Sequence, residues 1–491
     1  MWFGRRGKRM MRVLSVASEA YPLVKTGGLA DVVGALPAAL AEHGVATTTL
    51  LPGYPALANA VRTAKTVHRW PDLLGVEVRL LQARLGDQPL LVLDAPLLFA
   101  REGPIYTDPT GRDWQDNWRR FAALARAAAD LGSGAVEGFA FDLLHAHDWQ
   151  AALAPAYLKL APAGERVAKS VMTVHNIAFQ GNYGADLLSA IGLPPSAMDV
   201  EGVEYYGGIG YLKAGLWAAD AITTVSPTYA DEIRRPEFGM GLEGLIGSRR
   251  GRVHGIVNGI DPAVWNPDTD TALAARYSAK TLTKRAANTR AVEERFALEP
   301  SDGPLFCVVS RLTWQKGMDV LAGVLDELVA AGGRLALLGS GDPELEIAFA
   351  SAQIRHPGRI GVRIGYDEAL SHLLQGGADA ILIPSRFEPC GLTQLYGLAY
   401  GCVPVVAHTG GLADTVIDAN QAALAAGVAT GIVHHGVDPD SLIEAIRRTV
   451  ALHADAERWA TVQRNGMKAD NSWRESGRAY ARLYADLLED R

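Results

Sequence analysis

The sequence is poor in cysteine and lacks any long hydrophobic run. Three of its 491 residues are cysteine (Cys307, Cys390 and Cys402), and their spacing fits neither a disulfide framework nor a metal site. Such a chain suits a reducing compartment. No apolar stretch reaches the roughly 18 residues that a membrane span requires. The basic start also has no apolar region of the kind found in secretory signals. We therefore expect a cytoplasmic protein with no membrane partner.

The sequence also has no excess of basic residues. The chain has 47 Lys and Arg residues against 54 Asp and Glu residues, a net charge of −7. A nucleic-acid-binding surface needs the opposite balance, so no nucleic-acid partner is expected. The hydrophobic fraction of 48% and the charged fraction of 21% are typical of a globular protein, and the length predicts two or three domains. For residues 1–10 we expect a disordered tail or a true start at Met10 or Met11.

Apolar runs alternate with helical segments along the whole chain. Runs such as 12–17, 305–310 and 380–384 predict buried strands, and each is followed by a segment with helical periodicity or a helix-start signal. This alternation predicts an α/β fold with parallel sheets in two halves. The stretch GIVNGIDP at 255–262 predicts a turn, and we place the crossover between the halves at 255–265.

The hexapeptide TGGLAD occurs twice, at 26–31 and at 409–414, each time after a predicted strand. In the first copy Gly27 and Gly28 open a helix just after Lys25. The N–H groups at a helix start can bind an anion. The alternative is that the glycine pair only forms a turn between the strand and the helix. The two copies indicate two related layers that face one ligand.

Two basic side chains follow the first strand of the second half. Arg311 and Lys316 lie five residues apart in SRLTWQKG. Basic residues are unfavourable beside a helix N-terminus, so this placement favours a bound pyrophosphate over a solvated helix start. The arginine would contact two oxygens, and the lysine would act as a point charge.

Other polar residues follow predicted strands. Glu388 lies in the loop after the strand 380–384, and His175 follows the strand 170–174. Ligands bind at such strand ends in open α/β sheets. The alternatives are a solvated loop carboxylate and a structural histidine.

Two segments have compositions that suit sugar recognition. The run HAHDW at 145–149 combines an acidic side chain with an indole, and a metal is disfavoured because no third group of ligands accompanies the two histidines. The segment 104–121 contains Trp114 and Trp118. It suits a sugar surface or, equally, a helix start that packs two indoles into the core.

Acidic pairs of the kind that can hold a metal on a diphosphate occur twice. Asp268 with Asp270 and Asp438 with Asp440 lie in polar loops that contain proline, and we interpret both as surface turns. Arg311 and Lys316 are enough to neutralise a diphosphate leaving group. No metal and no other cofactor is therefore predicted.

These motifs together resemble the bacterial glycogen synthases, and the plant starch synthases are similar. The resemblance runs from about Met11 to Tyr484, nearly the whole chain. The motifs that carry it are KTGGLADV (25–32), HAHDWQ (145–150), TVHN (173–176), LKAGLWAADAITTVSPTYADEI (212–233), VNGID (257–261), SRLTWQKG (310–317), SRFEPCGLTQLYGLAYG (385–401) and TGGLADTV (409–416).

The resemblance implies a GT-B fold, in which two Rossmann-like domains face each other across a deep cleft and a C-terminal helix crosses back to the first domain. It implies an N-terminal domain over 11–254, on the acceptor side, and a C-terminal domain over 266–468, on the nucleotide-sugar side. The segment 469–491 would be the returning helix. The implied reaction is the retaining transfer of glucose from ADP-glucose to the 4-hydroxyl at the non-reducing end of an α-1,4-glucan such as glycogen, without a metal.

The resemblance also implies roles for particular residues. Catalysis would involve Glu388, His175, Arg311 and Lys316. The ADP-glucose site would comprise Lys25, Gly27, Gly28, Arg311, Lys316, Tyr366, Cys390, Gly391, Leu392, Thr409, Gly410 and Gly411, with Tyr366 on the adenine side and His175 beside the glucose. The sugar and acceptor region would include Asp31, Asp148, Trp149 and Asn258.

One position departs from other retaining enzymes of this architecture. Some of these enzymes carry a second Glu eight residues after the first, whereas here Glu388 is followed at that spacing by Tyr396. A two-carboxylate mechanism therefore has no support from this loop. We expect a front-face displacement in which the leaving phosphate oxygen helps to deprotonate the acceptor. Three other functions remain open at this stage: a glucosyltransferase that uses a UDP-sugar, a sugar-nucleotide epimerase, and a non-catalytic glucan-binding protein.

Overall fold

The computed structural model describes residues 10–161 and 168–489, and the chain divides into two compact units. The first unit extends to Val225 and includes Ala230–Ile256 and the residues from Trp473 onward. The second unit consists of Ser226–Tyr229 and Val257–Ser472. The tail predicted over residues 1–10 lies outside the described residues except for Met10. The chain changes unit after Ile256, within the crossover predicted at 255–265, and again after Ser472, within the segment predicted to return at 469–491.

A nine-stranded sheet forms the centre of the first unit, in the order β12-β11-β7-β6-β1-β2-β5-β4-β3. Its strands are β1 (Met11–Val16), β2 (Val45–Pro52), β3 (Lys65–Trp70), β4 (Val78–Leu85), β5 (Gln88–Asp94), β6 (Leu143–His147), β7 (Lys169–Val174), β11 (Ala221–Thr224) and β12 (Val253–Gly255). The strands from β12 to β5 are parallel, but β4 runs antiparallel to both β5 and β3. The prediction of purely parallel sheets was therefore wrong at this edge, where short connections turn the chain straight back.

The remaining elements of the first unit are helices and one small sheet. The small sheet contains β8 (Asn182–Gly184), β9 (Glu204–Tyr205) and β10 (Gly208–Gly210). The helices are α1 (Gly28–Ala41), α2 (Ala58–Val61), α3 (Pro96–Phe99), α4 (Asn117–Gly132), α5 (Asp148–Ala151), α6 (Leu153–Lys159), α7 (Tyr211–Ala218), α9 (Pro236–Gly239), α10 (Glu243–Ser248) and α21 (Trp473–Glu489), with α8 (Pro227–Glu232) divided between the two units.

The second unit has a six-stranded parallel sheet in the order β15-β14-β13-β16-β17-β18. Its strands are β13 (Leu305–Val309), β14 (Arg334–Gly339), β15 (Ile360–Ile364), β16 (Ala380–Ile383), β17 (Val403–Ala407) and β18 (Ile432–His434). Its helices are α11 (Arg285–Phe296), α12 (Met318–Gly323), α13 (Leu325–Ala330), α14 (Pro343–Arg355), α15 (Glu368–Gly377), α16 (Thr393–Tyr400), α17 (Gly410–Thr415), α18 (Gln421–Ala426), α19 (Pro439–His453) and α20 (Ala456–Lys468). Short 3₁₀ turns occur at η1 (Pro55–Leu57), η2 (Ala185–Leu187), η3 (Pro195–Ala197), η4 (Arg250–Arg252), η5 (Leu282–Lys284) and η6 (Trp314–Lys316).

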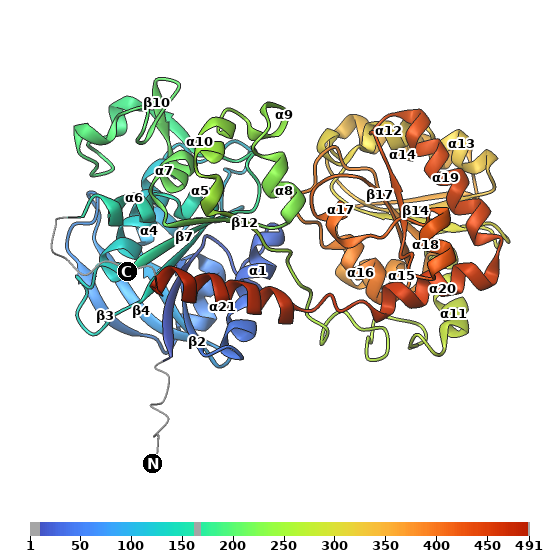
Figure 1. Cartoon of the computed structure of the whole chain (residues 1–491), viewed down its shortest axis with the longest axis horizontal. Helices are drawn as coiled ribbons and strands as arrows, with labels where there is room; N and C mark the ends of the chain where they lie inside the picture. The colour runs from blue at the N-terminus through green and yellow to red at the C-terminus, as the bar shows by residue number, and fades with distance from the viewer. Residues whose placement is uncertain (1–9, 162–167, 490–491) are drawn as a thin grey trace, which may run out of the picture. The chain divides into compact units, whose positions relative to one another are not determined.

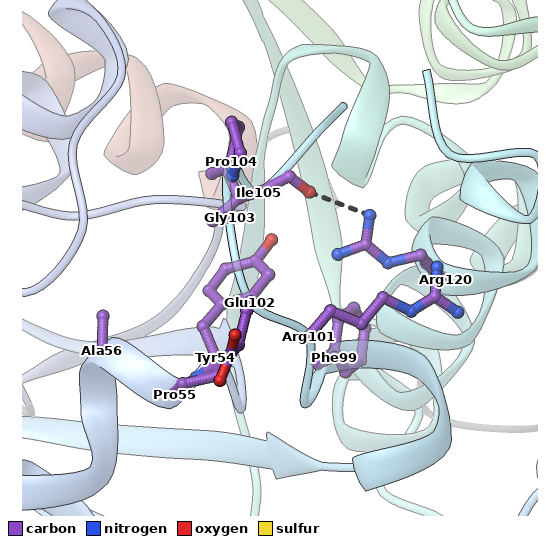
Figure 2. A pocket seen from close by; sticks show the side chains of 10 residues that line it. All are labelled: Tyr54, Pro55, Ala56, Phe99, Arg101, Glu102, Gly103, Pro104, Ile105 and Arg120. Atoms are coloured by element: carbon purple, nitrogen blue, oxygen red, sulfur yellow. Dashed lines mark hydrogen bonds between the residues drawn. The ribbon is translucent and has the colours of Figure 1, made fainter. Parts of the chain in front are cut away.

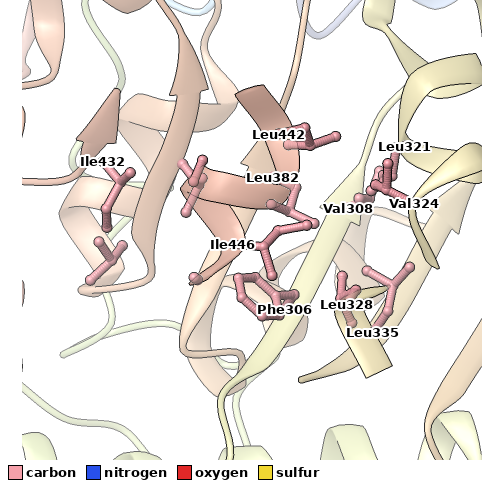
Figure 3. Close-up of a cluster of buried hydrophobic side chains, with 14 of the residues drawn as sticks. Phe306, Val308, Leu321, Val324, Leu328, Leu335, Leu382, Ile432, Leu442 and Ile446 are labelled. Carbon is pink, nitrogen blue, oxygen red and sulfur yellow. The ribbon is translucent and has the colours of Figure 1, made fainter. Parts of the chain in front are cut away.

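Aliphatic and aromatic side chains cover each face of the second sheet. On one face, Phe306, Leu335 and Leu382 of three neighbouring strands pack against Leu328 of α13 and Ile446 of α19, all of them buried (Figure 3). Alternate residues of the same strands, such as Cys307 and Ile381, point to the other face and pack against α11 and α15. Burial on both faces explains why these strands are continuous apolar runs in the sequence.

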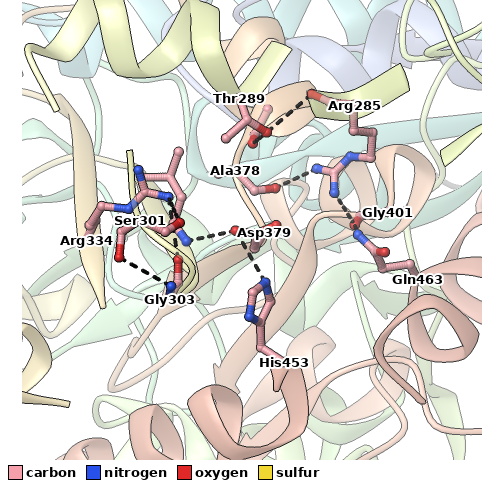
Figure 4. A network of polar contacts seen from close by, with 12 residues as sticks. Arg285, Thr289, Ser301, Gly303, Arg334, Ala378, Asp379, Gly401, His453 and Gln463 are labelled. Atoms are coloured by element: carbon pink, nitrogen blue, oxygen red, sulfur yellow. Dashed lines mark hydrogen bonds and ion pairs between the residues drawn. The ribbon is translucent and has the colours of Figure 1, made fainter. Parts of the chain in front are cut away.

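A buried arginine fixes the connection that leads into β16. The Arg285 guanidinium donates to the carbonyl oxygens of Gly376 (3.2 Å), Gly401 (3.0 Å) and Ala378 (2.5 Å) (Figure 4). Asp379, at the start of β16, accepts a 2.8 Å hydrogen bond from the backbone N–H of Leu305 at the start of β13. These contacts position the two strands whose far ends carry the predicted catalytic groups.

The C-terminal helix packs on the first unit. Helix α21 lies beside α1 (Figure 1). Its Trp473, Tyr480 and Tyr484 side chains are buried in one cluster with Val32 of α1. A side chain at Gly477 would meet the α1 backbone, because a Cβ there would lie 3.0 Å from the Ala39 carbonyl oxygen. The aromatic tail therefore packs on α1, as the returning helix of the resemblance requires.

Two local predictions differ from the structure. The helical segment predicted after the strand at 305–310 is not one helix, because it is broken at Val324 into α12 and α13. Asp270 is not in a surface turn: it is buried and accepts hydrogen bonds from the hydroxyl of Tyr400 (2.5 Å) and from His372 (2.7 Å). Partners distant in sequence, which the local pattern does not show, place this carboxylate inside. Among the residues described, no helix is both long and apolar enough to cross a membrane.

Candidate active site

Each sheet has one point at which the strand order reverses. In the first unit the chain proceeds from β1 to β2 and β5 on one side, whereas β6, β7 and β11 lie on the other side. In the second unit β13 leads to β14 and β15, whereas β16, β17 and β18 extend the opposite way. Ligands of open α/β sheets bind outside the carboxyl ends of the strands at such points. These points lie between β1 and β6 in the first unit and between β13 and β16 in the second.

The loop after β1 carries the first of the residues predicted to contact the nucleotide sugar. Lys25 is partly exposed, forms a 2.8 Å ion pair with Asp31 and lies 5.4 Å from the centre of the Tyr21 ring. At Gly27, a Cβ atom would meet no other atom within 4 Å, so this part of the loop is open. Lys25, Gly27, Gly28 and Asp31 thus form one group at the β1 end.

A residue that the sequence did not point out holds this loop. Glu19 is buried, and its carboxylate accepts hydrogen bonds from the backbone N–H groups of Thr26 (2.5 Å) and Gly27 (3.3 Å). These two N–H groups are therefore occupied by the protein itself and are not the anion donors that the glycine pair suggested. An acidic residue in the loop SEAYP gave no local signal of this role.

Three histidines lie together at the ends of β6 and β7. The ring Nδ1 of His147 is 3.1 Å from Nε2 of His175, and the His145 and His147 rings are 4.0 Å apart. The Asp148 carboxylate accepts a 2.7 Å hydrogen bond from the backbone N–H of His175, and its own backbone has a φ of 54°. A non-glycine residue in this left-handed conformation is held there by its surroundings. His175 and Asp148 are thus close together, at the β7 and β6 ends.

Burial sets the charge of this group. Desolvation lowers the pKa of His145 and of His175 to about 3, and it holds the pKa of His147 well below its usual value. Desolvation raises the pKa of Asp148 to about 7. The histidines are therefore neutral at neutral pH, and His175 can act as a hydrogen-bond donor or acceptor but not as a cation.

Trp149 differs from its predicted role in sugar binding. Its side chain is buried, with its ring edge-to-face against Phe121 at 4.9 Å. Gly181 packs on the indole, where a Cβ would lie 2.3 Å from a ring carbon. The indole therefore supports the loop that follows His175 and presents little surface to a sugar.

We expect the first unit to lose stability as the pH falls below 6.5. The folded-state pKa values of the three histidines are below the unfolded value, so the unfolded chain binds more protons and acid favours unfolding. Asp148 has the opposite effect, because its raised pKa favours the folded state below pH 7. Because the three histidines outweigh the one aspartate, the free energy of unfolding should fall by about 1 to 3 kcal/mol for each unit by which the pH is lowered.

Hydrogen exchange measures this loss, after correction for the intrinsic exchange rate. Amides of β6 and β7 should open more readily at pH 5 than at pH 7, whereas amides of β13 and β16 in the second unit serve as controls. His145→Gln should reduce the pH dependence. Equal, pH-independent opening of both sets would show that the buried histidines do not titrate as described.

In the second unit, charged side chains meet at the β13/β16 reversal. Lys316 follows β13 and forms a 2.5 Å ion pair with Glu388, which follows β16. The same Glu388 oxygen accepts a 3.0 Å hydrogen bond from Ser385. Arg311 is exposed and, within 10–161 and 168–489, its guanidinium has no hydrogen-bond or ion-pair partner. Arg311, Lys316 and Glu388 thus lie at one strand-end site, with a cation available to a ligand.

The loop after Glu388 contains the thiol of Cys390, and Asn258 lies beside that thiol. Burial raises the pKa of Cys390 to about 12, although hydrogen bonds from the backbone and side chain of Asn258 act in the opposite direction. Cys390 is therefore a neutral thiol and not a thiolate nucleophile. Asn258 is buried, and within the described part of the chain its side-chain oxygen has no hydrogen-bond partner. That oxygen is a candidate acceptor for a ligand hydroxyl.

The second TGGLAD copy packs against this loop. Gly410 has a φ of 42°, and a Cβ there would lie 2.0 Å from the carbonyl oxygen of Glu388. A Cβ at Gly411 would lie 2.2 Å from the carbonyl oxygen of Cys390, and the Gly411 N–H donates to the Glu388 and Pro389 carbonyl oxygens at 3.1 Å. The Gly411 N–H is thus not a donor for phosphate. Thr409, Gly410 and Gly411 form a tightly packed support for the loop 388–392, which includes Gly391 and Leu392.

The two hexapeptide copies therefore predict different effects of alanine. Gly411→Ala should lower the free energy of unfolding by about 1–3 kcal/mol or more, because the new methyl group meets backbone atoms. Gly27→Ala should change it by less than about 1 kcal/mol, because the site is open and φ is −158°. Denaturant unfolding measures both. A loss for Gly27→Ala as large as that for Gly411→Ala would contradict this distinction.

Tyr366 lies apart from the charged group. It lines a cavity of about 310 Å³ with Arg295 and Arg363, beyond the carboxyl ends of β14 and β15. Adjacent strands are about 4.8 Å apart, so β13 and β15 are separated by roughly 10 Å. This separation suits a ligand with its phosphates at Arg311 and its base at Tyr366.

A second cavity, of about 220 Å³, lies in the first unit. Tyr54, Phe99 and Arg101 line it, and the buried Arg120 donates a 2.8 Å hydrogen bond to the carbonyl oxygen of Ile105 in its wall (Figure 2). Pro104, Ile105 and Arg120 of the segment 104–121 also line it, but none of the residues assigned to catalysis or to the ADP-glucose site does. In the described parts of the chain, no three His, Cys, Asp or Glu side chains are grouped to hold a metal ion.

Comparison with known proteins defines the class. The family described as "Starch synthase catalytic domain" matches residues 12–248, and "Glycosyl transferases group 1" matches residues 290–465. The catalytic domain of starch synthase IV from Arabidopsis thaliana, solved with ADP and acarbose, has a TM-score of 0.85 at 30% identity, covering 98% of this chain and 99% of that one. Sucrose-phosphate synthase from Thermosynechococcus elongatus shares the fold, with a TM-score of 0.59 at 19% identity. The fold and the site together define a GT-B glycosyltransferase.

Sequence relatives narrow the assignment. A glycogen synthase from Novosphingobium aromaticivorans is 66% identical over 481 residues, which cover 98% of this chain and 99% of that protein. A glycogen synthase from Mesorhizobium japonicum is 58% identical over 481 residues, which cover 98% of this chain and 100% of that protein. The chain belongs to the glycogen synthase family, as the resemblance of its motifs predicted.

Proposed function

We propose that the chain transfers glucose from ADP-glucose to the 4-hydroxyl at the non-reducing end of an α-1,4-glucan, with retention, and so extends glycogen in the cytoplasm. The observation that carries the proposal is the group at β13/β16, where Arg311, Lys316 and Glu388 meet at the reversal point of a parallel sheet. Two cations suit a diphosphate leaving group, and a carboxylate beside them suits a sugar hydroxyl.

The proposed mechanism uses the leaving group itself. As the bond between C1 of glucose and the phosphate oxygen breaks, the glucan 4-oxygen bonds to the same face of C1. The proton of the 4-hydroxyl passes to the departing phosphate oxygen. Arg311 and Lys316 stabilise the negative charge that develops on the diphosphate. No metal or other cofactor takes part in this proposal, and full activity in the presence of EDTA would support that part of it.

Two features of the second unit favour this route over a covalent glycosyl-enzyme. Cys390 carries no charge at neutral pH. Tyr396, eight residues after Glu388, stacks on Trp265 with ring centres 3.6 Å apart. It therefore packs within the unit and leaves no place for a second carboxylate. Neither Cys390 nor Tyr396 supplies a nucleophile, so we assign the departing phosphate oxygen as the base.

The remaining roles follow from charge and exposure. We assign the neutral His175 ring and the side-chain oxygen of Asn258 to hydroxyl groups of the transferred sugar. Lys25 is assigned to the nucleotide sugar, and Tyr366 to the adenine ring. The solved starch synthase IV supports ADP as the nucleotide, because it was determined with ADP and acarbose.

Incubation with glycogen and radiolabelled ADP-glucose or UDP-glucose tests the function. We expect label in the polymer, with ADP-glucose as the better donor. Better incorporation from UDP-glucose would contradict ADP-glucose as the donor and identify the chain as a glucosyltransferase that uses a UDP-sugar. No incorporation from either donor would contradict the synthase and favour an epimerase or a glucan-binding protein, which are separated by analysing the sugar nucleotide for a new isomer.

A further inference from the structure

A single buried carboxylate organises the loop that carries Lys25. Glu19 is 3% exposed, and besides the backbone N–H groups of Thr26 and Gly27 it accepts hydrogen bonds from the Thr26 hydroxyl and the Tyr106 hydroxyl, each at 2.7 Å. All four donors are uncharged. A carboxylate has about four acceptor positions, so these donors use its full capacity.

The four contacts come from two segments that are distant in sequence. Thr26 and Gly27 end the loop after β1 and lead into α1, whereas Tyr106 belongs to the aromatic segment 104–121. The Tyr106 hydroxyl donates to Glu19 and can accept from the Ser18 hydroxyl, 2.6 Å away. The pKa of Tyr106 is held well above its usual value, mainly by burial and secondly by the nearby charge of Glu19. The phenol therefore remains a hydrogen-bond donor.

Two carboxylates hold the loop near Gly27. Glu19 fixes the backbone at Thr26 and Gly27, and Asp31 fixes the Lys25 side chain by the 2.8 Å ion pair. The space beside Gly27 in the direction of a Cβ is open, with no atom beyond the neighbouring residues within 4 Å of a Cβ placed there. A ligand on that side would meet a backbone whose conformation is already set, which reduces the entropy lost on binding.

We propose that Glu19 is a positioning residue for the donor: it holds the 25–27 loop in the conformation that presents Lys25 to the nucleotide sugar. The inference rests on the proposed function of Lys25. Glu19 does not contact the substrate in this proposal and acts through Lys25 and the loop backbone. Only a group that accepts from every side can do this, because an amide would place its own N–H groups against those of Thr26 or Gly27.

Glu19→Gln tests the proposal through the two Michaelis constants. We expect KM for ADP-glucose to rise by about tenfold or more, because charge-assisted hydrogen bonds to the loop are lost. KM for glycogen should change by less than about twofold. Glu77→Gln, at an exposed carboxylate of the same unit, is the matched control and should alter neither constant. An equal rise in both constants, or no change, would overturn the positioning role.

A double-variant cycle with Lys25→Ala separates positioning from general support of the fold. If Glu19 acts through Lys25, the combined loss in kcat/KM should be at least fivefold smaller than the product of the two single losses, on the scale of couplings between contacting groups. Multiplicative losses would overturn the proposal.

If Glu19→Gln does not fold, Thr26→Val removes one donor to Glu19 at nearly constant shape and should raise KM for ADP-glucose in the same direction. An inactive wild-type protein would instead count against the proposed function.

Discussion

Lys316→Ala and Arg311→Ala should each lower kcat by on the order of 10²-fold or more. Both side chains follow β13 and provide the positive charge that we assign to the departing diphosphate. Removing such groups has its largest effect on the rate of a step in which charge develops in the transition state. Steady-state kinetics with saturating ADP-glucose and glycogen measures the effect, and Lys280→Ala, at an exposed lysine of the same unit, is the matched control.

The Lys316 variant needs one further comparison because of the 2.5 Å ion pair with Glu388. Removal of Lys316 alone leaves a buried carboxylate unpaired, and this alone is destabilising. The double variant Lys316→Ala/Glu388→Gln removes the unpaired charge. If kcat of the double variant lies well below that of Glu388→Gln alone, the cation acts in the reaction. Near-normal kcat in Arg311→Ala, together with a double variant no slower than Glu388→Gln, would contradict the leaving-group assignment.

Glu388→Gln should lower kcat by on the order of 10–100-fold, with only a small change in KM for ADP-glucose. The substitution keeps the shape of the side chain but removes the charge that Lys316 and Ser385 contact. Glu344→Gln, at an exposed position in the first turn of α14, is the matched control. A change confined to KM would make Glu388 a residue of ground-state binding and remove it from the catalytic step.

The strand-end site of the second unit could be predicted because it follows from sheet geometry. Arg311 and Glu388 each follow a buried apolar run, and parallel strands place their carboxyl ends on one edge. The pairing of Lys316 with Glu388 could not be predicted in the same way. The two residues are 72 positions apart, and only the neighbouring arrangement of β13 and β16 brings them together.

The first unit shows where local patterns fail. Glu19 has no special context in the sequence, since its role depends on Tyr106, which lies 87 residues away. The two TGGLAD copies have the same letters but different surroundings: Gly27 is open, whereas Gly411 lies against Cys390. A repeated motif predicts a similar backbone, and the packing that surrounds it decides what each glycine does.

The most direct test of the account is the position and linkage of the glucose that is transferred. Glycogen labelled from radioactive ADP-glucose is digested with an exo-acting amylase that releases maltose from the non-reducing ends of α-1,4-glucans. We predict that the label is released in maltose at the start of the digestion. Label that resists this enzyme, or that appears only after complete digestion of the polymer, would contradict retaining transfer to the terminal 4-hydroxyl.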